Sequence, residues 1–149
     1  MNFLRAFLQK GTRVIPAEQQ YPNLVDDADL LTSEEEVSLL KLLDEITEAK
    51  QCTVAVVTVN SLEGKSATAF ADDFYDYNGY GYGPGDDGIM LVVSPGDRTW
   101  AITDFGKSTD MMRDNYDWLQ EQFVSLLASG NYYEAFTCFV NGCDTLLSE

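Results

Sequence analysis

The sequence predicts an α/β protein with three layers, in which helices cover both faces of a small mixed β-sheet. Two segments, Cys52–Val59 (CTVAVVTV) and Gly88–Ser94 (GIMLVVS), are rich in β-branched residues and almost continuously apolar. Such runs are typical of strands that are buried on both faces. The neighbouring segments carry apolar residues at helical spacing, and helices must lie on both sides of strands this apolar. The fold class is therefore a three-layer α/β/α sandwich.

The first helix is predicted to begin at a capping box, Thr32-Ser33-Glu34-Glu35, and to end near Lys50. The acids Glu34–Glu36 lie at the positive end of the helix dipole, which indicates helix stabilisation rather than a metal site. Periodic apolar residues predict three further helices, over Ser66–Asn78, Asp110–Ala128 and Asn131–Leu147.

Chain connections define the expected strand directions. The helix between Cys52–Val59 and Gly88–Ser94 predicts a right-handed crossover, which makes these two strands parallel. The turn sequence Ser94-Pro95-Gly96-Asp97 then predicts a hairpin to a third strand, Thr99–Asp104, which is antiparallel. The sheet is therefore expected to be mixed.

Composition excludes several classes of function. The 149 residues fit one domain, and the sequence contains no histidine, which excludes Ser-His-Asp and Cys-His nucleophiles and histidine metal ligands. Nine basic against 25 acidic residues give a net charge of −16. This charge argues against nucleic acid and anionic membranes as partners, and it favours divalent cations and basic proteins. The three cysteines are expected to be buried and unpaired.

Residues 1–20 differ in pattern from the rest of the chain. The first thirteen residues hold Arg5, Lys10 and Arg13 and no acid. Their apolar runs are too short for a signal peptide or a membrane span. We interpret residues 1–20 as a leader, as a remnant of recombinant expression or as an amphipathic arm. Residues 21–149 are then the domain. No run of 18 apolar residues occurs, so no transmembrane segment is expected.

Two acidic loops are candidate metal sites. Asp26-Asp27-Ala28-Asp29 precedes the first helix, and Asp86-Asp87 precedes a buried strand. If the two loops converge, they supply several hard oxygen ligands, which suit Ca²⁺ or Mg²⁺ and not Zn²⁺. The alternative is that Asp27 or Asp29 only caps a helix and that Asp86-Asp87 only makes a turn. The sequence leaves both open.

Two other features have a structural and a chemical interpretation. Asp27-x-Asp29 has the spacing of a phosphatase nucleophile pair, but that motif follows a hydrophobic strand, and Tyr21–Leu24 is not expected to form one. Arg98 lies at the tight hairpin of a domain with few basic residues. It either pairs with Asp97 or another nearby acid, or anchors an anion.

Several short motifs occur in a characteristic order between about Asn23 and Leu147. They are Val25-Asp26-x-Ala28-x-x-Leu31-Thr32-x-Glu34-Glu35, TVAVVTV with Ser61-Leu62, Ala71-x-x-Phe74, Asp86-Asp87-Gly88-Ile89-x-Leu91-Val92-Val93, Asp97-Arg98 and Gly130-x-Tyr132-Tyr133. In this order and spacing they resemble the TPM domain, formerly a domain of unknown function. The chain departs from the family at Asp104–Ser108 (DFGKS), where the family tends to have G-[YF]-G followed by Leu-Glu.

The resemblance implies a Rossmann-like sandwich and an extracytoplasmic location, as in thylakoid-lumen proteins that aid photosystem II repair and in bacterial envelope proteins. It also implies Ca²⁺ binding or acid phosphatase activity, and the acids concerned correspond to Asp26, Asp86 and Asp87. We therefore expect a Ca²⁺-binding accessory domain of the cell envelope with a protein partner, in which these three acids hold one Ca²⁺ ion (Mg²⁺ being possible). The alternative is a metal-dependent acid phosphatase that uses Asp87, Asp26 and Arg98.

Overall fold

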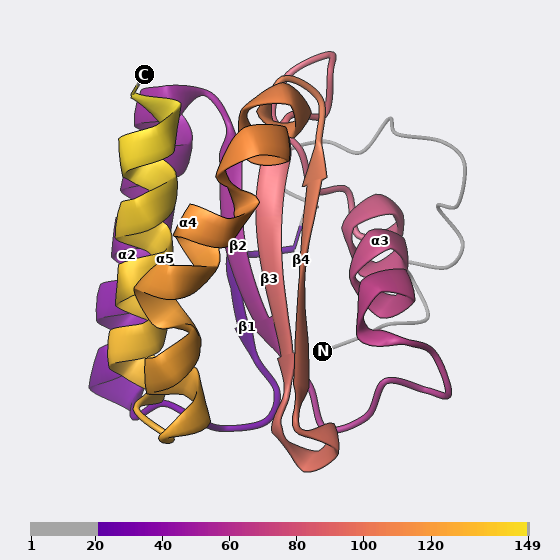
Figure 1. The fold of residues 1–149 in the computed structure, drawn as a ribbon, viewed down its shortest axis with the longest axis vertical. Helices are drawn as coiled ribbons and strands as arrows, with labels where there is room; N and C mark the ends of the chain where they lie inside the picture. Colours follow the sequence, from indigo (N-terminus) through magenta and orange to yellow (C-terminus); the bar gives the residue numbers. More distant parts are fainter. Residues whose placement is uncertain (1–20, 149) are drawn as a thin grey trace.

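A four-stranded sheet in the order β1-β2-β3-β4 forms the centre of the molecule (Figure 1). The structure is a computed structural model and describes residues 21–148. β1, β2 and β3 are parallel and β4 is antiparallel to β3, so the predicted mixed sheet is confirmed. The strands span Leu24–Asp26 (β1), Thr53–Thr58 (β2), Gly88–Ser94 (β3) and Thr99–Phe105 (β4).

Helices lie on both faces of this sheet, which confirms the three-layer sandwich. Three of the four helices within residues 21–148 pack on one face, and the fourth packs on the other face (Figure 1). The first group comprises α2 (Ser33–Lys50), α4 (Ser108–Ala128) and α5 (Tyr132–Leu147), and the fourth helix is α3 (Ala67–Tyr77).

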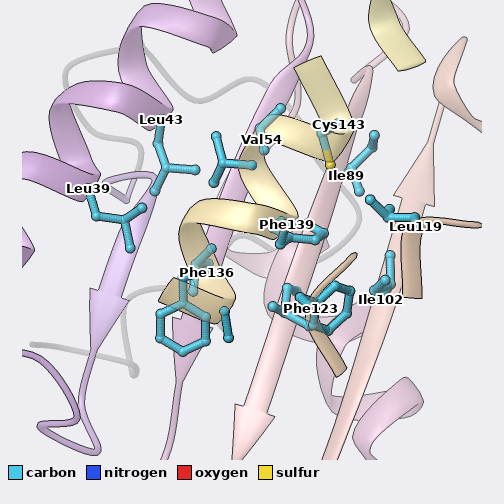
Figure 2. Packing of buried hydrophobic residues seen from close by; sticks show 14 of the residues in the cluster. Leu39, Leu43, Val54, Ile89, Ile102, Leu119, Phe123, Phe136, Phe139 and Cys143 are labelled. Carbon is cyan, nitrogen blue, oxygen red and sulfur yellow. The ribbon is translucent and has the colours of Figure 1, made fainter. Parts of the chain in front are cut away.

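The two faces of β3 show how one strand supports both layers. Ile89 and Leu91 point into the core beneath α2, α4 and α5, where Figure 2 shows Ile89 among the side chains of these helices. Met90 and Val92 point the other way, into the core beneath α3. All four side chains are fully buried, as expected for a strand whose sequence is continuously apolar.

The predicted capping box begins α2. The Thr32 hydroxyl oxygen accepts a hydrogen bond from the Glu35 N–H (3.1 Å), and the Glu35 carboxylate accepts one from the Thr32 N–H (3.0 Å). The helix ends at Lys50, and Gln51 follows in the left-handed conformation (φ 51°). This cap fixes the position of the first turn of α2, which matters for the candidate site.

The short strand β1 was not predicted from the sequence, and the expectation that no strand forms before the first helix is wrong. Its three residues are too few to show a periodicity. Pairing with β2 stabilises it, with Leu24 beside Val56 and Asp26 beside Thr58. Leu24 and Val25 are buried in the two different cores, so tertiary burial compensates for the weak local signal. β1 places Asp26 at the carboxyl end of a parallel strand.

The remaining predictions about the fold have mixed outcomes. The hairpin turn is confirmed as a short 3₁₀ helix, Pro95–Asp97. The three cysteines are free, with Cys52 and Cys143 buried and Cys138 partly buried. The predicted leader or arm, residues 1–20, lies outside the described residues. No helix within residues 21–148 is long and apolar enough to cross a membrane.

Candidate functional site

Asp26 is held in a fixed orientation where β1 ends. Its Oδ1 accepts hydrogen bonds from the Leu30 N–H (3.0 Å) and the Thr58 hydroxyl (2.7 Å), and its Oδ2 accepts one from the Leu31 N–H (3.0 Å). Thr58 is fully buried at the end of β2 and also accepts a hydrogen bond from the Ala28 N–H (3.1 Å). The loop from β1 to α2 is therefore wrapped around the Asp26 carboxylate.

This loop brings two further acids to Asp26. Asp29 turns the chain in the left-handed conformation (φ 56°), and Glu36 lies in the first turn of α2. One carboxylate oxygen from each of Asp26, Asp29 and Glu36 lies within 4.8 Å of the other two. Within residues 21–148, no other group of three or more acids or cysteines is gathered in this way.

Electrostatic crowding is visible at Glu36. The hydrogen bond with Asp26 raises the pKa of the Glu36 carboxyl, and partial burial and the charges of Asp26 and Asp29 raise it further. The protonated form of Glu36 is favoured because it can donate a hydrogen bond to Asp26, and because carboxylates this close repel one another when all are charged. A bound cation relieves the same repulsion, so the cluster is chemically suited to a hard divalent ion with oxygen ligands.

Asp27 has a different role from its neighbours. Its N–H donates to the Thr58 carbonyl oxygen (3.1 Å), and its own carbonyl oxygen accepts from the Asn60 side chain (2.9 Å). Burial raises the pKa of the Asp27 carboxyl, and the charge of Asp26 adds to this effect. Asp27-x-Asp29 directly follows a strand, β1, so the expectation that no strand precedes this pair is wrong.

The second acidic loop lies at the opposite end of the sheet. Asp26 pairs with Thr58 at the carboxyl end of β2, whereas Gly88, directly after Asp87, pairs with Thr53 at its amino end. Five residues of strand separate these positions, or about 16 Å. In Figure 1 the β3–β4 hairpin lies at one end of the sheet and the loop before β3 at the other. The prediction that the two loops converge on one ion is therefore wrong.

The Asp86-Asp87 loop is tied into the surrounding backbone as a turn. The Asp87 Oδ1 accepts a hydrogen bond from the Lys107 N–H (2.8 Å), and the backbone of Asp87 pairs with that of Tyr82. Asp86 has a left-handed backbone (φ 53°), and its carbonyl oxygen accepts from the Tyr75 hydroxyl (2.7 Å). These contacts agree with the alternative expectation that the pair makes a turn.

Arg98 does not join either acidic loop in a shared site. It lies at the hairpin, at the end of the sheet opposite Asp87. Asp26 is at the same end, but two to three strand spacings away, or about 10–14 Å between backbones. The expected phosphatase set of Asp87, Asp26 and Arg98 is therefore not brought together. Asp97 accepts a hydrogen bond from the Ser94 hydroxyl (2.8 Å) and forms no ion pair with Arg98 within residues 21–148.

The sequence predicts Asp26 as a ligand and places Asp29 in the same candidate loop, but its predicted set of three acids contains neither Asp29 nor Glu36. The sequence pattern assigned Glu36 to the helix dipole and left Asp29 as either part of a metal loop or a helix cap. The signal that could have found them is the close spacing of Asp26, Asp29 and Glu36 around a capping box, because that box fixes which way the first turn of the helix faces.

Comparison with known proteins agrees with this architecture. A model of the TPM domain matches residues 24–146. The chain belongs to the TPM domain family. The match begins at the first residue of β1 and ends one residue before the end of α5, so this TPM domain includes every strand and helix described above.

Solved structures share the fold of this TPM domain. The N-terminal domain of the cg2496 protein from Corynebacterium glutamicum is 15% identical, with a TM-score of 0.66 over 89% of this chain and 83% of that one. The N-terminal domain of a protein from P. gingivalis is 21% identical, with a TM-score of 0.69 over 88% and 84%. The BA42 protein from Bizionia argentinensis is 16% identical, with a TM-score of 0.71 over 79% and 81%. No curated protein matches the sequence.

Proposed function

We propose that this TPM domain is a Ca²⁺-binding accessory domain and that Asp26, Asp29 and Glu36 hold the ion. The observation that carries the proposal is the approach of these three carboxylates to within 4.8 Å of one another. Asp26 is already oriented by three hydrogen-bond donors, so binding requires little reorganisation of that ligand. The pKa of Glu36 is raised chiefly by its hydrogen bond with Asp26 and further by burial and the charges of Asp26 and Asp29, and a bound cation would relieve the repulsion among these charges.

The setting of the cluster favours Ca²⁺ over Mg²⁺. Ca²⁺ accepts six to eight oxygens at about 2.3–2.6 Å in irregular geometry, and carbonyl groups and water complete the shell. Mg²⁺ requires a nearly ideal octahedron. Asp29 is exposed, and Asp26 and Glu36 are only partly buried. A site this open binds weakly, with dissociation constants of about 10⁻⁴–10⁻³ M as in extracellular modules.

The weak affinity expected of this open site fits an extracytoplasmic location. Such a site is occupied only where free Ca²⁺ is abundant, which is the case outside the cytoplasm. We therefore propose that the protein acts at the cell envelope and that the ion stabilises a surface for a protein partner. A catalytic role is less well supported, because Asp87 and Arg98 lie at opposite ends of the sheet.

Isothermal titration of the full chain with CaCl₂ tests the metal site. We expect one Ca²⁺ per chain, with affinity reduced about tenfold or more in Glu36→Gln, because one charged ligand is lost. Glu34→Gln is the matched control. It removes the same charge from the same helix turn but lies outside the cluster, and it should leave the affinity within about twofold. Equal affinity of the two variants would refute the assignment.

A phosphatase assay tests the alternative. The full chain is incubated with p-nitrophenyl phosphate at acidic and neutral pH, with and without Ca²⁺ or Mg²⁺. The accessory role predicts no turnover above a denatured control. Turnover that requires the metal and disappears in Asp26→Asn would replace the accessory role with the enzymatic one.

A further inference from the structure

A second candidate site lies away from the acidic cluster, beside the β3–β4 hairpin. A cavity of about 320 Å³ opens between the hairpin, the end of α4 and the start of α5. Its volume is in the range of small-molecule sites. Most of the side chains that line it are apolar, among them those of Val93, Trp100, Leu127 and Ala128. Arg98 is the one cationic lining residue, and Ser94 and Thr99 add hydroxyl groups.

The apolar wall of this cavity is held in place by the core. The Trp100 ring packs edge-on against Phe123, with ring centroids 5.4 Å apart and planes at 75°. Phe123 is fully buried and packs in the same manner against Phe139 (5.6 Å, 83°). Trp100 itself remains partly exposed, so an aromatic surface stays available to a ligand.

In the described part of the chain Arg98 lacks an anionic partner, although the chain is rich in acids. Its neighbour Asp97 is engaged by the Ser94 hydroxyl (2.8 Å), and no acid within residues 21–148 forms an ion pair with Arg98. Three other cationic side chains in this part of the chain form ion pairs, Lys50 with Asp144, Lys65 with Asp73 and Arg113 with Asp110, whereas Lys41 and Lys107 form none there.

The backbone holds Arg98 at a position that favours glycine. Its φ is 52°, in the left-handed region, which is unfavourable for a residue with a long side chain. The 3₁₀ turn enforces this conformation through the hydrogen bond from the Arg98 N–H to the Pro95 carbonyl oxygen (3.1 Å). The Arg98 side chain therefore extends from a backbone position that the turn holds fixed.

We propose that this cavity binds a small organic anion with an aromatic or branched apolar body. Its carboxylate pairs with the planar guanidinium fork of Arg98, which matches a carboxylate with two parallel hydrogen bonds. Its apolar body packs against Trp100 and Leu127 and is thereby removed from contact with water. The cavity shares no residue with the acidic cluster, so this proposal does not depend on the proposed Ca²⁺ site.

Fluorescence titration tests the proposal on the full chain. The sequence has two tryptophans, and Trp118→Phe leaves Trp100, in the cavity wall, as the single reporter. The probes are phenylpropionate, its neutral analogue phenylpropionamide, and acetate, which lacks the apolar body. We expect saturable binding of phenylpropionate, and binding at least about tenfold weaker for the amide and for acetate. Equal binding of the acid and the amide would overturn the proposal, as would no saturable signal with phenylpropionate.

Two pairs of variants, made in the same background, assign the charge to Arg98. Arg98→Gln should weaken phenylpropionate binding about tenfold or more, while Arg113→Gln on α4 should not change it. Ala128→Glu places a carboxylate in the cavity wall and should block binding, while Ala128→Gln has nearly the same size without the charge and should retain it. The proposal is wrong if Arg98→Gln binds phenylpropionate normally, or if the two Ala128 variants behave alike.

Discussion

At the scale of single residues, Gly106 explains why the Asp86-Asp87 loop has a structural role. Gly106 has a φ of 69°, and a Cβ at this position would overlap Asp87 Oδ1 and lie 2.8 Å from the Gly85 carbonyl oxygen. The Asp87 carboxylate therefore fills the space that the glycine leaves open, and there it accepts the Lys107 N–H.

Gly106→Ala should accordingly destabilise the protein more than a glycine substitution elsewhere with similar backbone geometry. Gly64 is the matched control, because its φ is 82° and nothing lies within 4 Å of an added Cβ. Both alanines incur the left-handed penalty of about 1–2 kcal/mol. Only Gly106→Ala adds an overlap costing about 1–3 kcal/mol. Urea unfolding of both variants measures the difference, and equal losses of stability would contradict this account of Asp87.

Among the elements, the first turn of α2 is expected to make the stability of the protein depend on pH. The pKa of Glu36 is raised in the folded state, chiefly by its hydrogen bond with Asp26. Between the ordinary value of 4.5 and the raised value, the folded state therefore binds more protons than the unfolded state. The free energy of unfolding contributed by Glu36 must then fall as pH rises through this window.

Glu36→Gln removes this penalty. In chelator, the variant should equal the wild type near pH 4 and become the more stable of the two at pH 7, as measured by urea unfolding at both pH values. Saturating Ca²⁺ should reverse the order at pH 7, because only the wild type has the full ligand set. The control Glu34→Gln should gain nothing at pH 7. A Glu36→Gln variant that is less stable than the wild type in chelator at pH 7 would contradict the crowding argument.

The elements also show how far the sequence could predict this protein. Strong periodicity and buried apolar runs predicted α2 to α5 and β2 to β4, because those signals are local. β1 could not be predicted in this way, since three residues carry no period and their stability comes from pairing with β2. For the same reason, the sequence could not predict that Asp26 lies at the carboxyl end of a strand.

At the scale of the whole molecule, the sheet topology decides which acids share a site. The sequence placed two acidic loops next to strands but could not give the end of the sheet at which each one lies. Because β1, β2 and β3 are parallel, the loop after β1 and the loop before β3 lie at opposite ends. Asp29 and Glu36 reach Asp26 because the loop and the capped helix fold back over the end of β1.

Titration of the isotope-labelled full chain with CaCl₂, followed by amide chemical shifts, tests this central claim most directly. Ca²⁺ held by Asp26, Asp29 and Glu36 should shift the amides between Asp26 and Leu31 and those of the first turn of α2, together and saturably. The amides of Tyr82, Asp87 and Lys107, at the other end of the sheet, should remain unchanged. Saturable shifts at Asp87 and Lys107 without shifts at Asp29 and Glu36 would contradict the account.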